Sequence, residues 1–135
     1  MEGETMKFLV GYDGSNCAKD ALELAGKHAK AFGAQIIVAM SLEGGSETDA
    51  GQVQQAEEDL ALAETLMKDH GVDVETHLLV RGLNPGEDIV KYAEENNVDA
   101  IFIGVRRRSK VGKLLSGSNA QYIILKAPCP VMTIK

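Results

Sequence analysis

The sequence predicts a single α/β domain built on a doubly wound, five-stranded parallel sheet with helices on both faces. Two observations support this fold class. Five short apolar runs alternate along the chain with segments whose apolar residues recur at helical spacing, and such alternation is typical of right-handed βαβ units. The chain has 135 residues, close to the commonest domain size, so we expect residues 1–135 to form one domain.

The five expected strands differ in how continuously apolar they are. Residues 8–10, 36–38 and 101–103 are apolar without interruption, as in central strands that are covered on both faces. Residues 72–76 alternate between apolar and polar, which favours an edge strand. An edge position for the third strand and a central position for the first predict the strand order 3-2-1-4-5. The strands are expected at residues 7–11, 35–41, 72–80, 100–105 and 131–135.

Two amphipathic helices are expected before the third strand. Their apolar residues recur every three or four positions, which places these residues on one helix face. Residues 42–51 precede the second helix, and their Gly, Ser, Glu and Asp content indicates a mobile loop beside the functional site. The buried stripes are Ala18, Ala21, Leu22, Ala25, Ala29 and Phe32 in the first helix, and Val53, Ala56, Leu60, Ala63 and Met67 in the second.

Two further helices flank the fourth strand. The third helix is expected to begin after Asn84, with Asn84 as its cap and Glu87 completing a capping box. The fourth begins near Ser118 and must end before Pro128, because the residue preceding a proline disfavours helix. Their buried stripes are Ile89, Val90 and Ala93 in the third helix, and Ala120, Ile123, Ile124 and Ala127 in the fourth.

Charge is unevenly distributed along the chain. The formal net charge is -6, yet all twenty acidic residues lie in the first hundred positions. The segment that follows the fourth strand favours a local anion site, because arginine forks contact phosphate oxygens well. The acidic chain as a whole argues against nucleic-acid binding, which needs broad neutralisation of phosphates. The basic residues of the segment are Arg106, Arg107, Arg108, Lys110 and Lys113.

The sequence contains neither a metal-binding pattern nor an export signal. Cys17 and Cys129 give no disulfide framework and no metal-ligand spacing, and the three histidines form no metal set. The first seven residues contain no apolar signal segment, and no apolar run is long enough to span a bilayer. We therefore expect a cytoplasmic protein that does not bind membranes.

The functional site is expected where the first and fourth strands end, because ligands of doubly wound sheets bind where the strand order reverses. Asp13 follows the first strand; its carboxylate could hold ribose hydroxyls or a metal, or it could cap the first helix. Gly104 ends the fourth strand. Gly117 and Ser118 open the last helix, whose N–H groups favour an anion, although Ser118 could equally be an ordinary cap.

Three segments along the chain carry a family resemblance. They are residues 8–15 (FLVGYDGS), residues 98–104 (VDAIFIG), and Gly117-Ser118 together with residues 127–131 (APCPV). In combination they resemble the universal stress protein family over essentially the whole chain. The resemblance implies the strand order given above, an ATP or AMP site in many members, and a homodimer. The homodimer would be joined through the last strand, at Val131, Met132, Thr133 and Ile134.

The nucleotide-binding branch of that family shows Gly, two residues, Gly, nine residues, and then Gly followed by Ser or Thr. Gly104, Gly117 and Ser118 match this pattern, whereas Arg107 occupies the second glycine position. The arginine either obstructs the pocket or supplies charge to it, and the crowding of like charges on its segment favours the second. By similarity, ATP or AMP, with or without Mg, would contact Tyr12, Asp13, Ala39, Met40, Gly104, Val105, Arg107, Gly117, Ser118 and Asn119.

Three functions are compatible with these residues. The leading interpretation is a nucleotide-binding regulatory protein of the stress response, with at most slow hydrolysis. The second is a nucleotide-free dimeric interaction module, which Arg107 favours. The third is a weak ATPase or a nucleotidyl or phosphoryl transferase, although no residue pattern supplies a base to orient water or a second substrate site.

Overall fold

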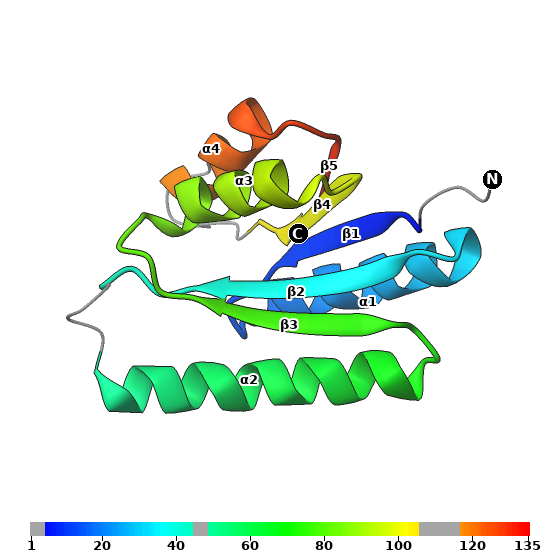
Figure 1. Cartoon of the computed structure of the whole chain (residues 1–135), viewed down its shortest axis with the longest axis horizontal. Helices are drawn as coiled ribbons and strands as arrows, with labels where there is room; N and C mark the ends of the chain where they lie inside the picture. Colours follow the sequence, from blue (N-terminus) through cyan, green and yellow to red (C-terminus); the bar gives the residue numbers. More distant parts are fainter. Residues whose placement is uncertain (1–4, 45–48, 106–116) are drawn as a thin grey trace.

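The computed structural model describes residues 5–44, 49–105 and 117–135 of the chain. In these residues the strands form one parallel sheet in the order β3-β2-β1-β4-β5 (Figure 1), which confirms the predicted fold class and strand order. The elements are β1 (Lys7–Gly11), α1 (Asn16–Phe32), β2 (Gln35–Ser41), α2 (Ala50–Asp69), β3 (Val74–Leu79), α3 (Pro85–Asn96), β4 (Ala100–Gly104), α4 (Ser118–Lys126) and β5 (Val131–Ile134).

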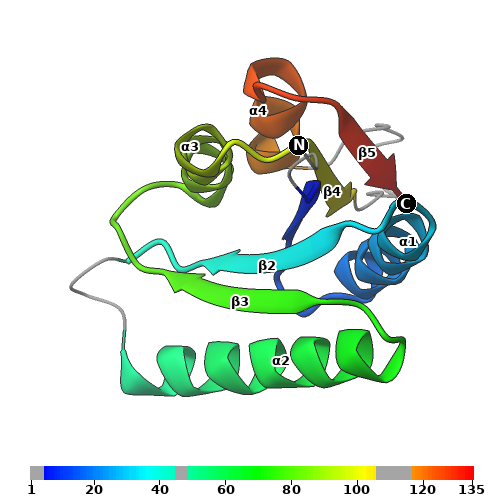
Figure 2. The ribbon, with the colours of Figure 1, turned by 45° about the vertical axis from the view of Figure 1, so that its right-hand side comes forward.

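Each face of the sheet carries its own apolar core. Phe8 and Val10 of β1 pack with residues of α1 and α2, whereas Leu9 packs on the opposite face with residues of α3 and α4. Figure 2 shows α3 and α4 on one side of the sheet and α2 on the other. Leu9 and Val10 are both 0% exposed. Burial on both faces explains why β1 is continuously apolar rather than alternating.

The start of α2 differs from the prediction. The helix begins at Ala50, inside the segment that was expected to be a loop. Asp49 accepts a hydrogen bond from the backbone N–H of Gln52 at 2.7 Å, and the Gln52 side chain accepts one from the Asp49 N–H at 3.3 Å. This reciprocal capping box satisfies two of the N–H groups that lack partners at a helix start.

Two residues assigned to buried stripes are exposed. Phe32 is the last residue of α1 and is 62% exposed; its ring meets that of Phe8 edge-on, with centroids 6.2 Å apart. Ile124 is 38% exposed, because α4 buries the face that carries Ile123. Within the described part of the chain, no helix combines the length and the apolarity that a membrane span requires.

Candidate functional site

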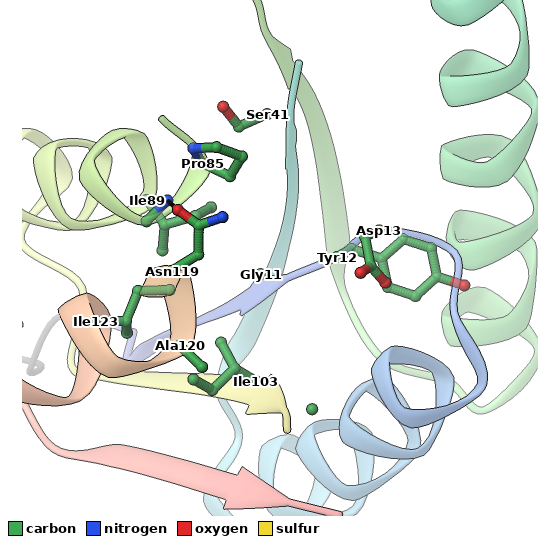
Figure 3. A pocket seen from close by; sticks show the side chains of 12 residues that line it. Gly11, Tyr12, Asp13, Ser41, Pro85, Ile89, Ile103, Asn119, Ala120 and Ile123 are labelled. Atoms are coloured by element: carbon green, nitrogen blue, oxygen red, sulfur yellow. Dashed lines mark hydrogen bonds between the residues drawn. The ribbon is translucent and has the colours of Figure 1, made fainter. Parts of the chain in front are cut away.

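A cavity of about 200 Å³ lies where β1, β2 and β4 end and α3 and α4 begin. This is the edge of the sheet at which the strand order reverses, as expected for a doubly wound fold. Figure 3 shows Ser41 and Pro85 together at one end of the cavity, and Ile103 and Ala120 at the other. The lining residues are Gly11, Tyr12, Asp13, Ser41, Pro85, Gly86, Ile89, Ile103, Gly104, Asn119, Ala120 and Ile123.

Gly104 brings the end of β4 into close contact with the first turn of α1. A Cβ atom at this position would lie 2.4 Å from the backbone carbonyl carbon and oxygen of Cys17. Real side chains do not approach backbone so closely, so a glycine is required here by helix-to-strand packing. The same closeness places the start of α1 beside the cavity that Gly104 lines.

Asp13 orders the turn that leads from β1 into α1. Its Oδ1 accepts a hydrogen bond from the backbone N–H of Ser15 at 2.9 Å. Ser15 is the N-cap, and its Oγ accepts from the N–H of Ala18 at 3.3 Å. The alternative in which Asp13 caps the first helix is therefore wrong, and its carboxylate lines the cavity.

The surroundings of the Tyr12 hydroxyl show the electrostatic character of the site near Asp13. The residue is buried against the core under α1 and α2. Burial raises the pKa of its hydroxyl, and the negative charges of Asp59 and Asp13 raise that pKa further. Two carboxylates thus act on one phenol, so this corner of the site favours groups that donate hydrogen bonds, such as the hydroxyls of a sugar.

The starts of α3 and α4 are joined at the cavity by a side-chain hydrogen bond. Asn119 Oδ1 accepts from the backbone N–H of Gly86 at 2.8 Å. A Cβ atom at Gly86 would lie 2.8 Å from the Asn119 carbonyl oxygen, so a glycine lets the two helices approach. Asn84 occupies the N-cap position and Pro85 begins the helix, as predicted, but the Asn84 side chain makes no capping bond. Asn119 supplies the acceptor at this helix start instead.

A buried carboxylate lies behind the β2 end of the cavity. Asp88 is 0% exposed. Its Oδ2 accepts from Ser41 Oγ at 2.6 Å, and its Oδ1 accepts from Arg81 Nε at 2.6 Å. Arg81 also pairs with Glu95 at 2.9 Å. Burial lowers the pKa of Arg81, but its hydrogen bonds to Glu95 and Asp88 outweigh burial and the pKa is raised.

Sequence reasoning missed the Ser41, Asp88 and Arg81 cluster. Ser41 is the last residue of β2, and Asp88 lies 47 positions further along the chain in the first turn of α3. An acidic residue in the first turn of a helix is commonplace, because it complements the helix dipole. The only available signal was an Arg and an Asp that flank a helix start, and that signal does not specify burial.

The structure distributes the predicted site residues over three environments. Tyr12, Asp13, Gly104 and Asn119 line the cavity. Ala39, Met40 and Val105 lie in the apolar cores outside this lining, with Met40 on the side of α1 and α2. Gly117, with φ 83°, and Ser118 are exposed at the start of α4. Arg107 and the rest of the basic segment lie outside the described residues.

No group of three or more His, Cys, Asp or Glu side chains suited to a metal ion occurs in residues 5–44, 49–105 and 117–135. The polar groups that line the cavity are a carboxylate, a hydroxyl, an amide and backbone groups of Asp13, Ser41, Asn119 and Gly86. Such a mixture suits an organic ligand that both donates and accepts hydrogen bonds.

Comparisons with known proteins agree with this architecture. The model of the universal stress protein family matches residues 4–135. A universal stress protein of Thermus aquaticus is 34% identical over 136 residues, covering 94% of this chain and 96% of the relative.

Two solved structures from Archaeoglobus fulgidus are also similar. A universal stress protein is 41% identical with a TM-score of 0.90, covering 98% of this chain and 100% of its own. A universal stress protein in complex with dAMP is 37% identical with a TM-score of 0.83, covering 96% and 98%. Because the family model spans nearly all of the sequence and these relatives match over almost their full length, the chain belongs to the universal stress protein family.

Proposed function

We propose that this protein binds an adenine nucleotide, AMP or ATP, in the cavity at the ends of β1, β2 and β4, and that it acts as a regulator in the stress response. The observation that carries the proposal is a single cavity lined by Asp13 and by the starts of α3 and α4. A family member 37% identical to this chain has been solved in complex with dAMP, which supports the ligand class. The regulatory role rests on the family.

The lining suggests how the nucleotide would lie. The start of α4 follows β4, and helix N-termini stabilise phosphate through unpaired N–H groups and the helix dipole. Asp13 lies in the turn that follows β1, the strand between β2 and β4, and would accept hydrogen bonds from the ribose hydroxyls. Pro85 and Ile89 give the β2 end of the cavity an apolar wall, which would hold the base.

Magnesium would enter the site with ATP rather than before it. Mg²⁺ is usually bound through substrate phosphates and one or two carboxylates, and it retains several waters. Asp13 is the carboxylate in the lining and would hold the ion from the protein side. Removal of magnesium with EDTA is expected to weaken binding of ATP and to leave AMP binding unchanged.

Isothermal titration calorimetry tests the proposed function. Saturable binding of AMP and ATP is expected, and Asp13→Ala should weaken AMP binding by about tenfold because a charge-assisted hydrogen bond is lost. Ser118→Ala should weaken ATP binding by a smaller factor. Asp69→Ala removes a carboxylate of the same charge at the end of α2 and should leave the affinity for both nucleotides unchanged. Absence of saturation at millimolar nucleotide would instead favour the nucleotide-free interaction module.

The same protein preparation separates binding from catalysis. Slow hydrolysis would appear as less than one phosphate released per protein in the time of the titration. Sustained phosphate release that Asp13→Asn abolishes would favour the ATPase or transferase interpretation instead, because turnover needs a group that orients the attacking water.

We also propose that two copies of the chain pair through β5. This strand lies at an edge of the sheet, and Met132 on it is 41% exposed. Leu125 of the adjacent α4 is 72% exposed. An uncovered apolar edge strand invites pairing with another strand, and a second copy would cover both groups.

A further inference from the structure

The hydrogen bonds of the buried Asp88 carboxylate are divided between its two oxygens. Oδ1 accepts from Arg81 Nε at 2.6 Å, and the backbone carbonyl oxygen of Asp88 accepts from Arg81 Nη2 at 3.2 Å. Oδ2 accepts from Ser41 Oγ at 2.6 Å. The guanidinium is always charged, so its partner is the carboxylate form, and a carboxylate only accepts.

This arrangement restricts what Ser41 can do in the cavity. A serine hydroxyl has one hydrogen and two lone pairs. The hydrogen is directed to Asp88 Oδ2, and hydrogen bonds to an ionised acceptor are roughly twice as strong as neutral ones. The oxygen therefore presents only lone pairs to the cavity that Ser41 lines, so it can accept a hydrogen bond from a ligand but cannot donate one.

Ser41 lies at the β2 end of the cavity, where Pro85 also lies (Figure 3). Pairing between β1 and β2 stops at Gly11 and Ala39, two residues before Ser41. Pro85 and Ile89 form the apolar wall beside it. A nucleotide whose base packs on this apolar wall would bring an edge of the base to Ser41.

We propose that Ser41 is a specificity-determining residue that accepts a hydrogen bond from the exocyclic amine of a 6-aminopurine, and that Asp88 is the positioning residue that gives the hydroxyl this polarity. The inference rests on the proposed nucleotide function and adds the selection of the base. A 6-oxopurine presents a carbonyl oxygen at the same place. Two acceptors then face each other without a hydrogen between them, and the site discriminates against that base.

Titration of AMP and IMP tests this proposal, because the two nucleotides differ only in the group at position 6 and the proton on the adjacent ring nitrogen. Wild type should bind AMP about tenfold more tightly than IMP, the factor expected for one unpaired buried acceptor. Ser41→Ala should weaken AMP binding, leave IMP binding unchanged and bring the ratio of the two affinities close to one. Ser41→Thr keeps the hydroxyl and should preserve the preference for AMP.

Asp88→Asn tests the polarity itself. An amide with its oxygen toward Arg81 directs its NH₂ at Ser41, which frees the serine hydrogen to donate to a ligand. The ratio of affinities should therefore shift toward IMP although the Ser41 hydroxyl is still present. If Asp88 had only a structural role, its substitution would weaken the binding of both nucleotides alike. Should Asp88→Asn fail to fold, as judged by circular dichroism, the Ser41→Ala and Ser41→Thr pair still decides the role of Ser41.

The outcomes distinguish base selection by Ser41 from nucleotide binding itself. Wild type that binds AMP and IMP equally, or Ser41→Ala that retains the preference for AMP, overturns the inference while nucleotide binding stands. Failure of wild type to bind AMP and ATP overturns the proposed function and the inference together. A loss of preference in Ser41→Ala that Asp88→Asn does not reproduce overturns the positioning role of Asp88.

Discussion

Gly104 meets α1 so closely that a side chain would displace backbone atoms. A Cβ atom would lie 2.4 Å from the Cys17 carbonyl group and 2.8 Å from the Ala18 nitrogen. We expect Gly104→Ala to lower the free energy of unfolding by about 2 kcal/mol, the usual cost of overpacking a site that cannot easily relax. Urea denaturation followed by circular dichroism measures this loss.

Gly33 provides the matched control for that substitution. It has φ 68° at the end of α1, and no atom lies within 4 Å of a Cβ placed there. Gly33→Ala therefore introduces only the strain of the left-handed conformation, about 1 kcal/mol. Gly104 is not one of the glycines with positive φ, so a loss in Gly104→Ala no larger than in Gly33→Ala would show that the close contact with Cys17 relaxes and does not require a glycine.

Proximity to a strand end allowed some site residues to be predicted from the sequence, and similarity to the family added Asn119 at the start of α4. Asp13 and Gly104 directly follow or close apolar runs, so their position at the cavity followed from the sheet. Met40 is also near a strand end, but the alternation of side chains turns it toward the core under α1 and α2. Ser41, one residue later, faces the cavity instead, because successive side chains of a strand point to opposite faces.

The junction of α3 and α4 depends on a bond between elements rather than on a local cap. Asn119→Ala should lower the free energy of unfolding by about 1 kcal/mol, because the N–H of Gly86 loses its acceptor. The same substitution should weaken AMP binding, since Asn119 lines the cavity. Denaturation and calorimetry on one preparation measure both effects.

Asn84→Ala is the companion to that variant. Local sequence rules name Asn84 as the helix cap, whereas the structure shows no capping bond from its side chain. Its removal should change stability by less than about 0.5 kcal/mol, as for most surface substitutions. A larger loss for Asn84→Ala than for Asn119→Ala would contradict the hydrogen bond between the helices and support the local cap.

At the level of the whole molecule, the outer edge of β5, the last strand in the sheet order, can be blocked without disturbing the rest of the sheet. The carbonyl groups of Pro130 and Ile134 accept from the N–H groups of Ile101 in β4 and of Val105 just after it, at 2.9 and 2.7 Å. The N–H of Thr133 therefore points away from β4, because backbone groups alternate along a strand. Thr133→Pro should convert a dimer into a monomer, since proline removes this outward donor.

Light scattering after size-exclusion chromatography measures the mass of wild type and variant. Thr133→Ala retains the N–H group and should remain dimeric, which distinguishes loss of strand pairing from loss of the side chain. A wild type that elutes as a monomer of 14.5 kDa would rule out the proposed dimer. Retention of the dimer in Thr133→Pro would place the interface elsewhere.

The sequence by itself determined the elements, their order along the chain and the strand order of the sheet. These follow from periodicities of two and about 3.6 residues and from which strands are apolar on both faces, and each is a property of neighbouring residues. It also placed Asp13 and Gly104 at the edge where the strand order reverses. The family followed from three short motifs and was then established by comparison.

Only the tertiary structure decided which polar groups meet at that edge. The bonds from Ser41 to Asp88 and from Gly86 to Asn119 join residues 47 and 33 positions apart. These bonds depend on the distance and rotation between elements that form separately. Local propensities carry no information about either quantity. A buried charge and a hydrogen bond between two helices produce no periodic pattern in the sequence, so they can be identified only from the packing of the helices on the sheet.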